Sequence, residues 1–338
     1  MAFVSVDGGA TKTMAVCYGR TGEILGIGAG GPSNYRNIGV ESAKENLYGS
    51  IKRAIERSSS SFDEIEKLTF AMAGVKDSKE STSIIEKFVT EMGFNKPYTL
   101  LNDGEAGFNC RFFEQDGIIS APGTGMIAYG RKGNVMERSS GWGWLIGDEG
   151  GGFYLGRRAI QESARIADGR SGGSQVILDE VMKFFRVQEP RQLVNEVYEK
   201  PINIRRIAMV ARIVSKLASR GDKTAESLLN EAAEENARCI IALQARMSAY
   251  DLPVSGYGGV YRSGKIYWEK IKDAVVEKNP GTVFINPLYG YHAVLGSMYM
   301  VLKQTGKKDI DQKGIEDDFN KKIDSLPVSE KSEYLLIP

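Results

Sequence analysis

The length, composition and charge of the sequence are those of an ordinary globular protein. With 338 residues it is longer than one compact core usually is, which favours two domains. Apolar residues make up 42% and charged residues 26%, and a net charge of +1 excludes a bulk field that recruits nucleic acid or an anionic membrane. The apolar runs are too short to span a membrane, and the N-terminus lacks the pattern of a secretory signal, so neither is expected.

Cysteine and histidine are scarce. Cys17, Cys110 and Cys239 are scattered and odd in number, which is typical of reduced thiols rather than a disulfide framework. The single histidine, His292, excludes a site built from several histidine ligands. We therefore expect a cytoplasmic protein.

The first 116 residues alternate between strand and helix patterns. Strands are predicted at residues 2–7, 13–19, 23–29, 68–73 and 98–101. Helices are predicted at residues 41–57 and 79–92, where apolar residues recur every three or four positions. Strands that alternate with helices indicate an α/β sheet with parallel central strands.

A second strand cluster follows, and its order repeats that of the first. Strands are predicted at 117–121, 126–130 and 133–138, and apolar runs at 253–257 and 282–286. Helices fill most of 149–248, with the clearest at 222–248, and recur at 264–278 and 291–303. The charged tail after Gly306 is predicted to be a peripheral helix or a partly ordered segment. Because a glycine-rich hairpin precedes helices twice, the sequence predicts a duplicated architecture.

A polar, glycine-rich turn separates the first two strands and reads Asp7-Gly8-Gly9-Ala10-Thr11-Lys12-Thr13. Adjacent glycines let backbone N–H groups approach an anion closely, and threonine hydroxyls can add donors to phosphate oxygens. An aspartate at a strand end can hold Mg²⁺, directly or through water. The spacing is not that of a Walker loop. The segment therefore indicates a phosphate site, with a plain hairpin turn as the alternative.

Two further glycine turns come later in the chain. Ser120-Ala121-Pro122-Gly123-Thr124-Gly125 again separates two strands and can present N–H groups to an anion. Ser255-Gly256-Tyr257-Gly258-Gly259-Val260 precedes a helix, and its glycines could let a planar base lie against the backbone. Each turn alone is equally explained as an ordinary connection, so the order of all three carries the argument.

That order resembles the actin/hexokinase/heat-shock-chaperone ATPase superfamily. The resemblance implies an α/β, actin-like (ribonuclease-H-like), duplicated two-domain fold with an interdomain cleft. It implies a domain at 1–116, a domain at 117–290 with a helical insertion at about 149–248, a helix at about 291–303 that returns to the first domain, and a charged tail at 305–338. ATP and Mg²⁺ are the implied cofactors, with the metal at Asp7. The implied ATP contacts are Gly8, Gly9, Thr11, Lys12, Thr13, Gly123, Thr124, Gly125, Gly258 and Gly259.

Three segments narrow the resemblance to sugar kinases. Residues 31–39 (GPSNYRNIG), 102–106 (NDGEA) and 140–150 (SGWGWLIGDEG) are similar to the N-acetylglucosamine kinase branch, which includes archaeal hexokinases and 2-keto-3-deoxygluconate kinases. The similarity extends from residue 3 to about 303. It implies transfer of the γ-phosphate of ATP to a hydroxyl of a small sugar or sugar acid. The implied sugar contacts are Asn34, Arg36, Asn102, Trp142, Gly143 and Asp148.

The resemblance places the catalytic base at Asp103. A sugar hydroxyl is a poor nucleophile at neutral pH, and a carboxylate within hydrogen-bond reach can accept its proton as the new P–O bond forms. Asp103 follows a predicted strand and precedes a glycine, where a side chain can face a cleft. The alternative is a helix N-cap. Asp148 has the same alternative, and Trp142 is either a flat surface for a sugar ring or a core residue.

Arg36 departs from the resemblance, because the N-acetylglucosamine kinases carry a bulky aromatic residue in this loop. A guanidinium can pair with a carboxylate through two hydrogen bonds, which favours a sugar acid over a neutral hexose. Together with the resemblance to the archaeal 2-keto-3-deoxygluconate kinases, this makes a kinase for 2-keto-3-deoxygluconate the function predicted first, with a hexose or N-acetylglucosamine kinase as the alternative. An arginine that faces solvent or pairs with a protein carboxylate is the competing interpretation of Arg36.

Two functions of other classes remain open. The first is an ATP-driven activator of a radical dehydratase, which shares the fold and holds an iron–sulfur cluster between two subunits. The second is a sugar sensor without catalysis, against which the intact Asp103 and both glycine hairpins argue. The sequence leaves a homodimer open.

Overall fold

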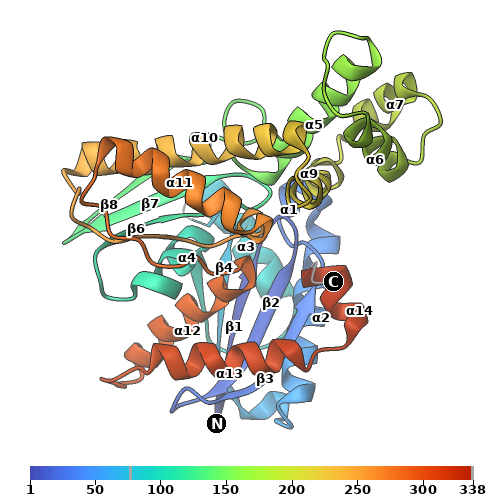
Figure 1. The fold of residues 1–338 in the computed structure, drawn as a ribbon. Helices are drawn as coiled ribbons and strands as arrows, with labels where there is room; N and C mark the ends of the chain where they lie inside the picture. The colour runs from blue at the N-terminus through green and yellow to red at the C-terminus, as the bar shows by residue number, and fades with distance from the viewer. Residues whose placement is uncertain (76–77, 336–338) are drawn as a thin grey trace. The chain divides into compact units, whose positions relative to one another are not determined.

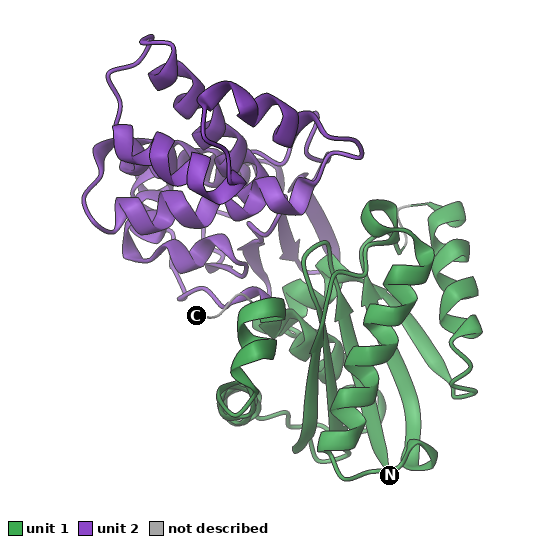
Figure 2. Cartoon of the chain, turned by 90° about the vertical axis from the view of Figure 1, so that its right-hand side faces the viewer, with its two compact units in different colours: residues 1–114, 291–338 green, residues 115–290 purple. Residues whose placement is uncertain are grey.

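The computed structural model describes residues 1–75 and 78–335 (Figure 1). The chain forms two compact units, the first from residues 1–114 and 291–338 and the second from residues 115–290 (Figure 2). For comparison, the sequence predicts a boundary at residue 116 and a helix near the C-terminus that returns to the first domain. No helix within the described residues has the length and hydropathy of a membrane span.

Unit 1 is built on a five-stranded sheet with the order β3-β2-β1-β4-β5. Its strands are β1 (Ala2–Gly8), β2 (Thr13–Gly19), β3 (Ile24–Gly30), β4 (Ile65–Met72) and β5 (Tyr98–Asn102). β1, β2 and β3 pair antiparallel, whereas β4 pairs parallel to β1 and β5 pairs parallel to β4. The carboxyl ends of β1, β4 and β5 therefore lie at one edge of the sheet.

Helices cover both faces of this sheet because its strands alternate two apolar sets of side chains. Val4 and Val6 of β1 belong to the core formed with α2 (Val40–Arg57) and α3 (Lys79–Glu91). Phe3 of β1 belongs to the core on the other face, with α12 (Ala293–Gln304) and α13 (Gln312–Asp324). The short helix α1 (Tyr35–Ile38) follows the loop after β3, and α4 (Asp103–Phe112) follows β5 directly.

A glycine stripe on β3 explains how closely α2 packs on the sheet. Gly26, Gly28 and Gly30 alternate with larger residues, so they share one strand face. A Cβ at Gly26 would lie 2.3 Å from the carbonyl oxygen of Ala54, and one at Gly28 would lie 2.2 Å from that of Ser50. Any side chain there would collide with the backbone of α2.

The charged tail is part of unit 1 as far as the structure describes it. Ile315, Phe319 and Ile323 of α13 are buried in the core that contains β2 and β3. Arg57 of α2 pairs with Glu330 at 2.6 Å, in the short helix α14 (Val328–Glu330). The expected peripheral helix is present, and it buries an apolar face in unit 1 that the sequence analysis did not predict. Residues 336–338 of the predicted tail lie outside the described part.

Unit 2 contains a four-stranded sheet with the order β8-β7-β6-β9. Its strands are β6 (Gly117–Ser120), β7 (Ile127–Lys132), β8 (Val135–Ser140) and β9 (Val254–Gly256). β6, β7 and β8 pair antiparallel, and β9 pairs parallel to β6. This repeats the connectivity of β1 to β4 in unit 1, as the duplicated pattern predicted. The apolar run at 282–286 forms only isolated bridges to the sheet.

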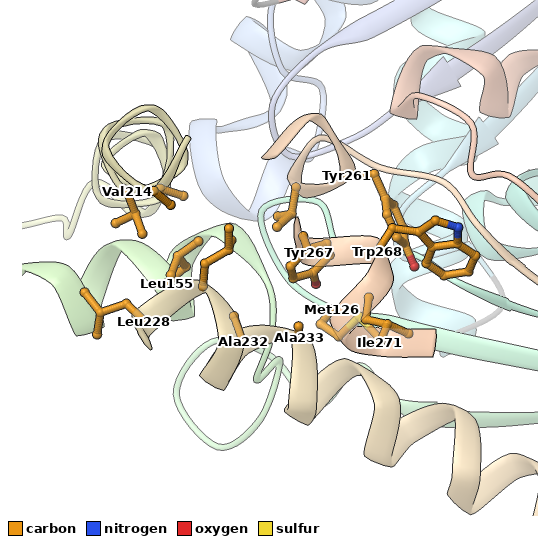
Figure 3. Packing of buried hydrophobic residues seen from close by; sticks show 14 of the residues in the cluster. Met126, Leu155, Val214, Leu228, Ala232, Ala233, Tyr261, Tyr267, Trp268 and Ile271 are labelled. Atoms are coloured by element: carbon orange, nitrogen blue, oxygen red, sulfur yellow. The ribbon is translucent and has the colours of Figure 1, made fainter. Parts of the chain in front are cut away.

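Helices supply most of the core of unit 2. They are α5 (Gly152–Ala167), α6 (Gln175–Phe185), α7 (Leu193–Tyr198), α8 (Ile204–Met209), α9 (Ala211–Ala218), α10 (Lys223–Met247) and α11 (Lys265–Lys278). α10 lies along β6, β7 and β8 and beside α11. Figure 3 shows Ala232 and Ala233 of α10 in the packing with Tyr267 and Ile271 of α11. The small alanines let these two helices approach closely.

Candidate functional site

The turn between β1 and β2 is compact and closely packed. The backbone N–H of Gly9 donates to the carbonyl of Lys12 at 3.0 Å, and Gly8 pairs with Thr13 across the hairpin. A Cβ at Gly8 would lie 2.4 Å from the sulfur of Met72 and 2.5 Å from Oγ of Ser33. Gly9, Thr11 and Lys12 are part-exposed in the turn itself. These are the turn residues that can meet an anion.

Asp7 is a buried carboxylate at the end of β1, only 6% exposed. Burial raises the pKa of its carboxyl above the ordinary value, and the Lys12 ammonium, 3.8 Å away, partly offsets that rise. Even with Lys12 nearby, the raised pKa means that the ionised carboxylate lowers stability, and a bound metal cation would relieve this. Mg²⁺ is commonly held by one or two carboxylates together with phosphate oxygens and water, so Asp7 fits as a protein carboxylate of such a site. Within the described residues, no cluster of three or more acidic, histidine or cysteine side chains offers a dedicated metal cage.

Asp7→Asn is expected to stabilise the ligand-free protein at neutral pH while lowering MgATP-dependent activity. The folded state raises the pKa of Asp7, so ionisation above that pKa disfavours folding. The advantage of the variant should vanish as the pH falls below the ordinary aspartate pKa of about 4, where the carboxyl is protonated in both states. Thermal unfolding at pH 7 and at low pH, with the exposed Asp63→Asn as control, measures this. A less stable variant at pH 7 would contradict it.

The loop that follows β3 lies directly on this turn. The backbone N–H groups of Ser33 and Asn34 both donate to the carbonyl of Gly9, at 3.0 and 3.2 Å. Asn34 also caps α1, accepting from the N–H of Arg36 at 3.1 Å. Arg36 is exposed, with its guanidinium carbon 6.0 Å from the ring centre of Tyr35. The predicted phosphate and sugar segments of unit 1 are therefore in contact.

Thr13 lies behind the turn. Its side chain is completely buried, and Oγ1 donates to the carbonyl of Gly31 at 2.8 Å and lies 2.9 Å from Oγ of Ser33. A hydroxyl has one proton to donate, and this one is used inside the protein. The Thr13 hydroxyl therefore binds the loop, and it has no proton left to donate to a phosphate oxygen as the sequence predicted. Sequence reasoning missed Ser33, although this small polar residue stands directly before Asn34.

Asp103 lies at the same sheet edge as the turn. Gly8 pairs with Met72, and Met72 pairs with Asn102, so the ends of β1, β4 and β5 are in register. With neighbouring strands about 4.8 Å apart, Gly8 and Asn102 are separated by about 10 Å. Asp103 is the first residue of α4 and is part-exposed. The carboxyl ends of parallel strands are where α/β proteins bind ligands.

The N-cap of α4 is Asn102 rather than Asp103. The side-chain oxygen of Asn102 accepts from the N–H of Gly104 at 2.9 Å, and its amide donates to the carbonyl of Val75 at 2.8 Å. The capping alternative for Asp103 is therefore wrong, although Asp103 also accepts from Gly104 at 3.0 Å. These bonds use one of the two amide protons of Asn102 and one of the two lone pairs of its oxygen, so its predicted sugar contact does not require either bond to open.

In unit 2, the turn after β6 is held by the start of α5. The carbonyls of Gly123 and Thr124 accept from the N–H groups of Gly152 and Phe153, both at 2.8 Å. A Cβ at Gly151 would lie 2.5 Å from the carbonyl of Gly125, so this position also needs glycine. With both carbonyls bound to the helix, the turn can offer an anion backbone N–H groups, although that of Gly123 already donates to the carbonyl of Ala121 at 3.0 Å.

The third glycine turn packs against the second. The N–H of Val260 donates to the carbonyl of Pro122 at 3.1 Å, and a Cβ at Gly258 would lie 2.5 Å from that oxygen. Gly258 has φ +147°, a conformation that L residues rarely adopt, and Gly259 is exposed. Unit 2 therefore brings together both segments predicted to hold nucleotide.

The segment Gly141–Gly150 forms a loop beside the second turn. Asp148 has φ +61° and accepts from the N–H of Gly143 at 3.0 Å, and a Cβ at Gly125 would lie 2.2 Å from its Oδ2. Burial is the main cause that raises the pKa of Asp148. Trp142 is 67% exposed, so the core alternative for this residue is wrong. Its ring lies 5.7 Å from the guanidinium carbon of Arg138.

The same loop borders a cavity of about 320 Å³ that lies within unit 2. Its lining runs from Trp144 to Arg157 and includes Phe153, whose ring centre lies 5.2 Å from that of Trp144. Leu145 and Ile146 at the loop tip are 77% and 74% exposed. The tip therefore presents apolar side chains next to residues predicted to contact sugar.

Known proteins resemble the chain over most of its length. An N-acetylmuramic acid/N-acetylglucosamine kinase of Clostridium acetobutylicum is 31% identical, over 69% of this chain and 76% of that protein. An N-acetyl-D-glucosamine kinase of Dictyostelium discoideum is 25% identical, over 68% and 75%. A solved structure from Chromobacterium violaceum superposes with a TM-score of 0.67 at 22% identity, covering 89% of this chain and 98% of the other. That structure supports the fold alone.

The family model for the BadF/BadG/BcrA/BcrD ATPases matches residues 4–300, which include all three glycine turns and Asp103. The tail beyond residue 305 lies outside the match. The resemblance inferred from the motifs is confirmed, as is the duplicated actin-like fold. The chain is an enzyme, a phosphotransferase, and it belongs to the BadF/BadG/BcrA/BcrD ATPase family.

Proposed function

We propose that this enzyme transfers the γ-phosphate of ATP to a hydroxyl of N-acetylglucosamine or a closely related N-acetylated amino sugar. The observation that carries the proposal is the register of unit 1, in which β1 and β5, on either side of β4, bring the phosphate-type turn and Asp103 to the same edge of the sheet. The two curated relatives are named as kinases of this class of sugar, which supports the choice of substrate.

The proposed chemistry uses few protein groups. The Asp103 carboxylate accepts the proton of the sugar hydroxyl as its oxygen bonds to the γ-phosphorus, and the bond from that phosphorus to the bridging oxygen breaks to release ADP. Mg²⁺ neutralises charge on the phosphate oxygens. The Lys12 ammonium and N–H groups of the turn between β1 and β2, other than that of Gly9, stabilise the same charge. Gly123, Thr124 and Gly125 are proposed as further phosphate contacts. Gly258 and Gly259 are proposed to contact adenosine.

The first-ranked prediction, phosphorylation of 2-keto-3-deoxygluconate, finds no support in the comparisons, whose names fit the alternative better. Arg36 still favours a carboxylate, and N-acetylmuramic acid is N-acetylglucosamine that carries a lactyl carboxylate. We therefore place Arg36 next to that substituent. Asn34, Trp142 and Asp148 remain proposed contacts to the sugar ring.

Arg36→Ala is expected to raise KM for N-acetylmuramic acid by about 10-fold or more, the scale of a lost charge-assisted hydrogen bond, and to leave KM for N-acetylglucosamine nearly unchanged. Arg36→Lys keeps the positive charge but loses the paired hydrogen-bond donors of the guanidinium. Its KM for N-acetylmuramic acid should therefore lie between those of the wild type and Arg36→Ala. A coupled ADP-release assay over both sugars, glucose, glucosamine and 2-keto-3-deoxygluconate measures this. Equal effects on both N-acetylated sugars would remove Arg36 from recognition of the carboxylate.

The dehydratase-activator alternative fits the cysteines poorly. Cys17 and Cys110 are buried in unit 1, where burial raises the pKa of both thiols. An intersubunit iron–sulfur cluster needs accessible thiolates near a dimer axis. A cytoplasmic location and a homodimer remain predictions.

A further inference from the structure

The hydroxyl pair of Thr13 and Ser33 joins the two ligand segments of unit 1. Both side chains are completely buried, and their oxygens lie 2.9 Å apart. Thr13 begins β2 directly after the turn proposed to hold phosphate, and Ser33 directly precedes Asn34, which is proposed to contact sugar. Thr13 also donates to the carbonyl of Gly31, at the start of the same loop. The pair therefore fastens the sugar loop to the phosphate turn from the protein side.

Backbone bonds fasten the two segments a second time. The carbonyl of Gly9 accepts from both Ser33 and Asn34, while the N–H of Gly9 closes the turn onto Lys12. The space between the segments is also filled, because a Cβ at Gly8 would lie 2.5 Å from Oγ of Ser33. The loop cannot shift without moving the Gly9 carbonyl or leaving buried polar groups unpaired, which lowers stability.

The far side of the loop is anchored to α2. The side-chain amide of Asn46 donates to the carbonyl of Pro32 at 2.7 Å, and a Cβ at Gly31 would lie 2.8 Å from the side-chain oxygen of Asn46. The loop is thus held between a helix and the turn, with Asn34 and Arg36 as its part-exposed and exposed end. Asn34 itself is bonded to the turn, whereas the bond to α2 is made by Pro32.

We infer that Thr13 and Ser33 are positioning residues that couple sugar binding to the affinity for the phosphates of ATP. Sugar that orders Asn34 also orders the Gly9 carbonyl, and thereby the N–H groups of the turn. Such coupling is reciprocal, so ATP must raise the affinity for sugar by the same factor. This inference rests on the proposed function, because it takes Asn34 as a sugar contact and the turn as a phosphate site.

Linked binding measurements test the coupling. The dissociation constant of a non-hydrolysable ATP analogue with Mg²⁺ is measured by calorimetry with and without saturating N-acetylglucosamine. The wild-type ratio is expected to be about 5- to 150-fold, the usual range of coupling between sites. Thr13→Val keeps the shape and removes the hydroxyl, so it should lower the ratio by about 5-fold, the scale of one net hydrogen bond. Thr13→Ser keeps the hydroxyl and should restore it.

Ser5→Ala is the matched control. It removes another buried hydroxyl pair from the same hairpin, Ser5 with Tyr18 at 3.0 Å, away from the turn. It should leave the ratio at the wild-type value. Ser33→Ala removes the other half of the link and should match Thr13→Val, so that poor folding of one variant does not decide the result.

Two results would overturn the coupling. One is a Thr13→Val or Ser33→Ala variant that binds both ligands with the wild-type ratio. The other is a wild-type protein that binds both ligands independently. In either case the proposed function stands, because both ligands bind. Failure of the wild type to bind N-acetylglucosamine at all would instead refute the proposed function.

Discussion

Asp103→Asn is expected to lower kcat by about 10²- to 10⁴-fold and to leave the affinities for ATP and sugar nearly unchanged. The amide keeps the size of the side chain and can still accept from the N–H of Gly104, so α4 should begin as before. What it loses is the ability to take a proton from the sugar hydroxyl. Steady-state kinetics together with calorimetric binding of both ligands separates chemistry from binding.

The local structure around Asp103 allows a loss of catalysis to be distinguished from a loss of structure. Asn102 caps α4 and binds the carbonyl of Val75, so the start of the helix is held by side-chain bonds that the substitution leaves in place. Asp63→Asn, an exposed aspartate of the same unit, should retain wild-type turnover. Near-normal turnover in Asp103→Asn would remove this residue from the role of base.

Gly296→Ala is expected to destabilise unit 1 and to lower kcat with it. A Cβ at Gly296 of α12 would lie 1.8 Å from the carbonyl oxygen of Ala106 and 2.7 Å from the N–H nitrogen of Cys110, both in α4. Backbone atoms cannot rotate away, so the helices must separate. Overpacking of this kind costs about 1–3 kcal/mol, of which the better helix propensity of alanine returns at most about 1 kcal/mol. Because α4 begins at Asp103, the shift should also misplace the base.

Gly49→Ala in α2 is the matched control for Gly296→Ala. The nearest atoms to its Cβ would be those of the Arg53 guanidinium, at 3.3 Å and beyond, rather than backbone, so alanine should change stability far less than at Gly296. Urea unfolding of both variants measures the difference. A Gly296→Ala protein as stable as the wild type, with normal kcat, would show that close packing of α12 does not position α4.

Much of the fold follows from short-range patterns in the sequence. The alternation of Val4 and Val6 with Phe3 predicts a strand covered on both faces, and the structure has helices on both. The long apolar stripe of residues 222–248 predicts α10 to within a residue at each end. The run at 282–286 has no such regular apolar pattern. It pairs with Val254 of β9, which is distant in the sequence, so the pairing cannot be predicted from the run itself.

The candidate site was less predictable, because it depends on which atoms meet. The glycine turns can be recognised in the sequence by their adjacent glycines. The structure explains two of these glycines, because Gly8 and Gly258 approach other residues too closely for any side chain. The buried partner of Thr13 is not visible in the sequence, because Ser33 lies twenty positions away and is joined to it by tertiary structure. The sequence also does not show that Asn102 is the residue that caps α4, since either of two adjacent polar residues can cap a helix.

Substrate choice was the least predictable feature. Arg36 gives the right chemistry for a carboxylate, but an exposed guanidinium does not say which molecule carries that carboxylate. The named relatives moved the choice from a keto sugar acid to N-acetylated amino sugars.

Analysis of the products formed from ATP and N-acetylglucosamine tests the central claim most directly. Phosphorus NMR of a reaction with the purified protein should show ADP and a sugar phosphate ester rising in equal amounts, with ADP formation nearly absent when the sugar is left out. ADP formed at the same rate without any sugar, or inorganic phosphate in place of the ester, would contradict the account.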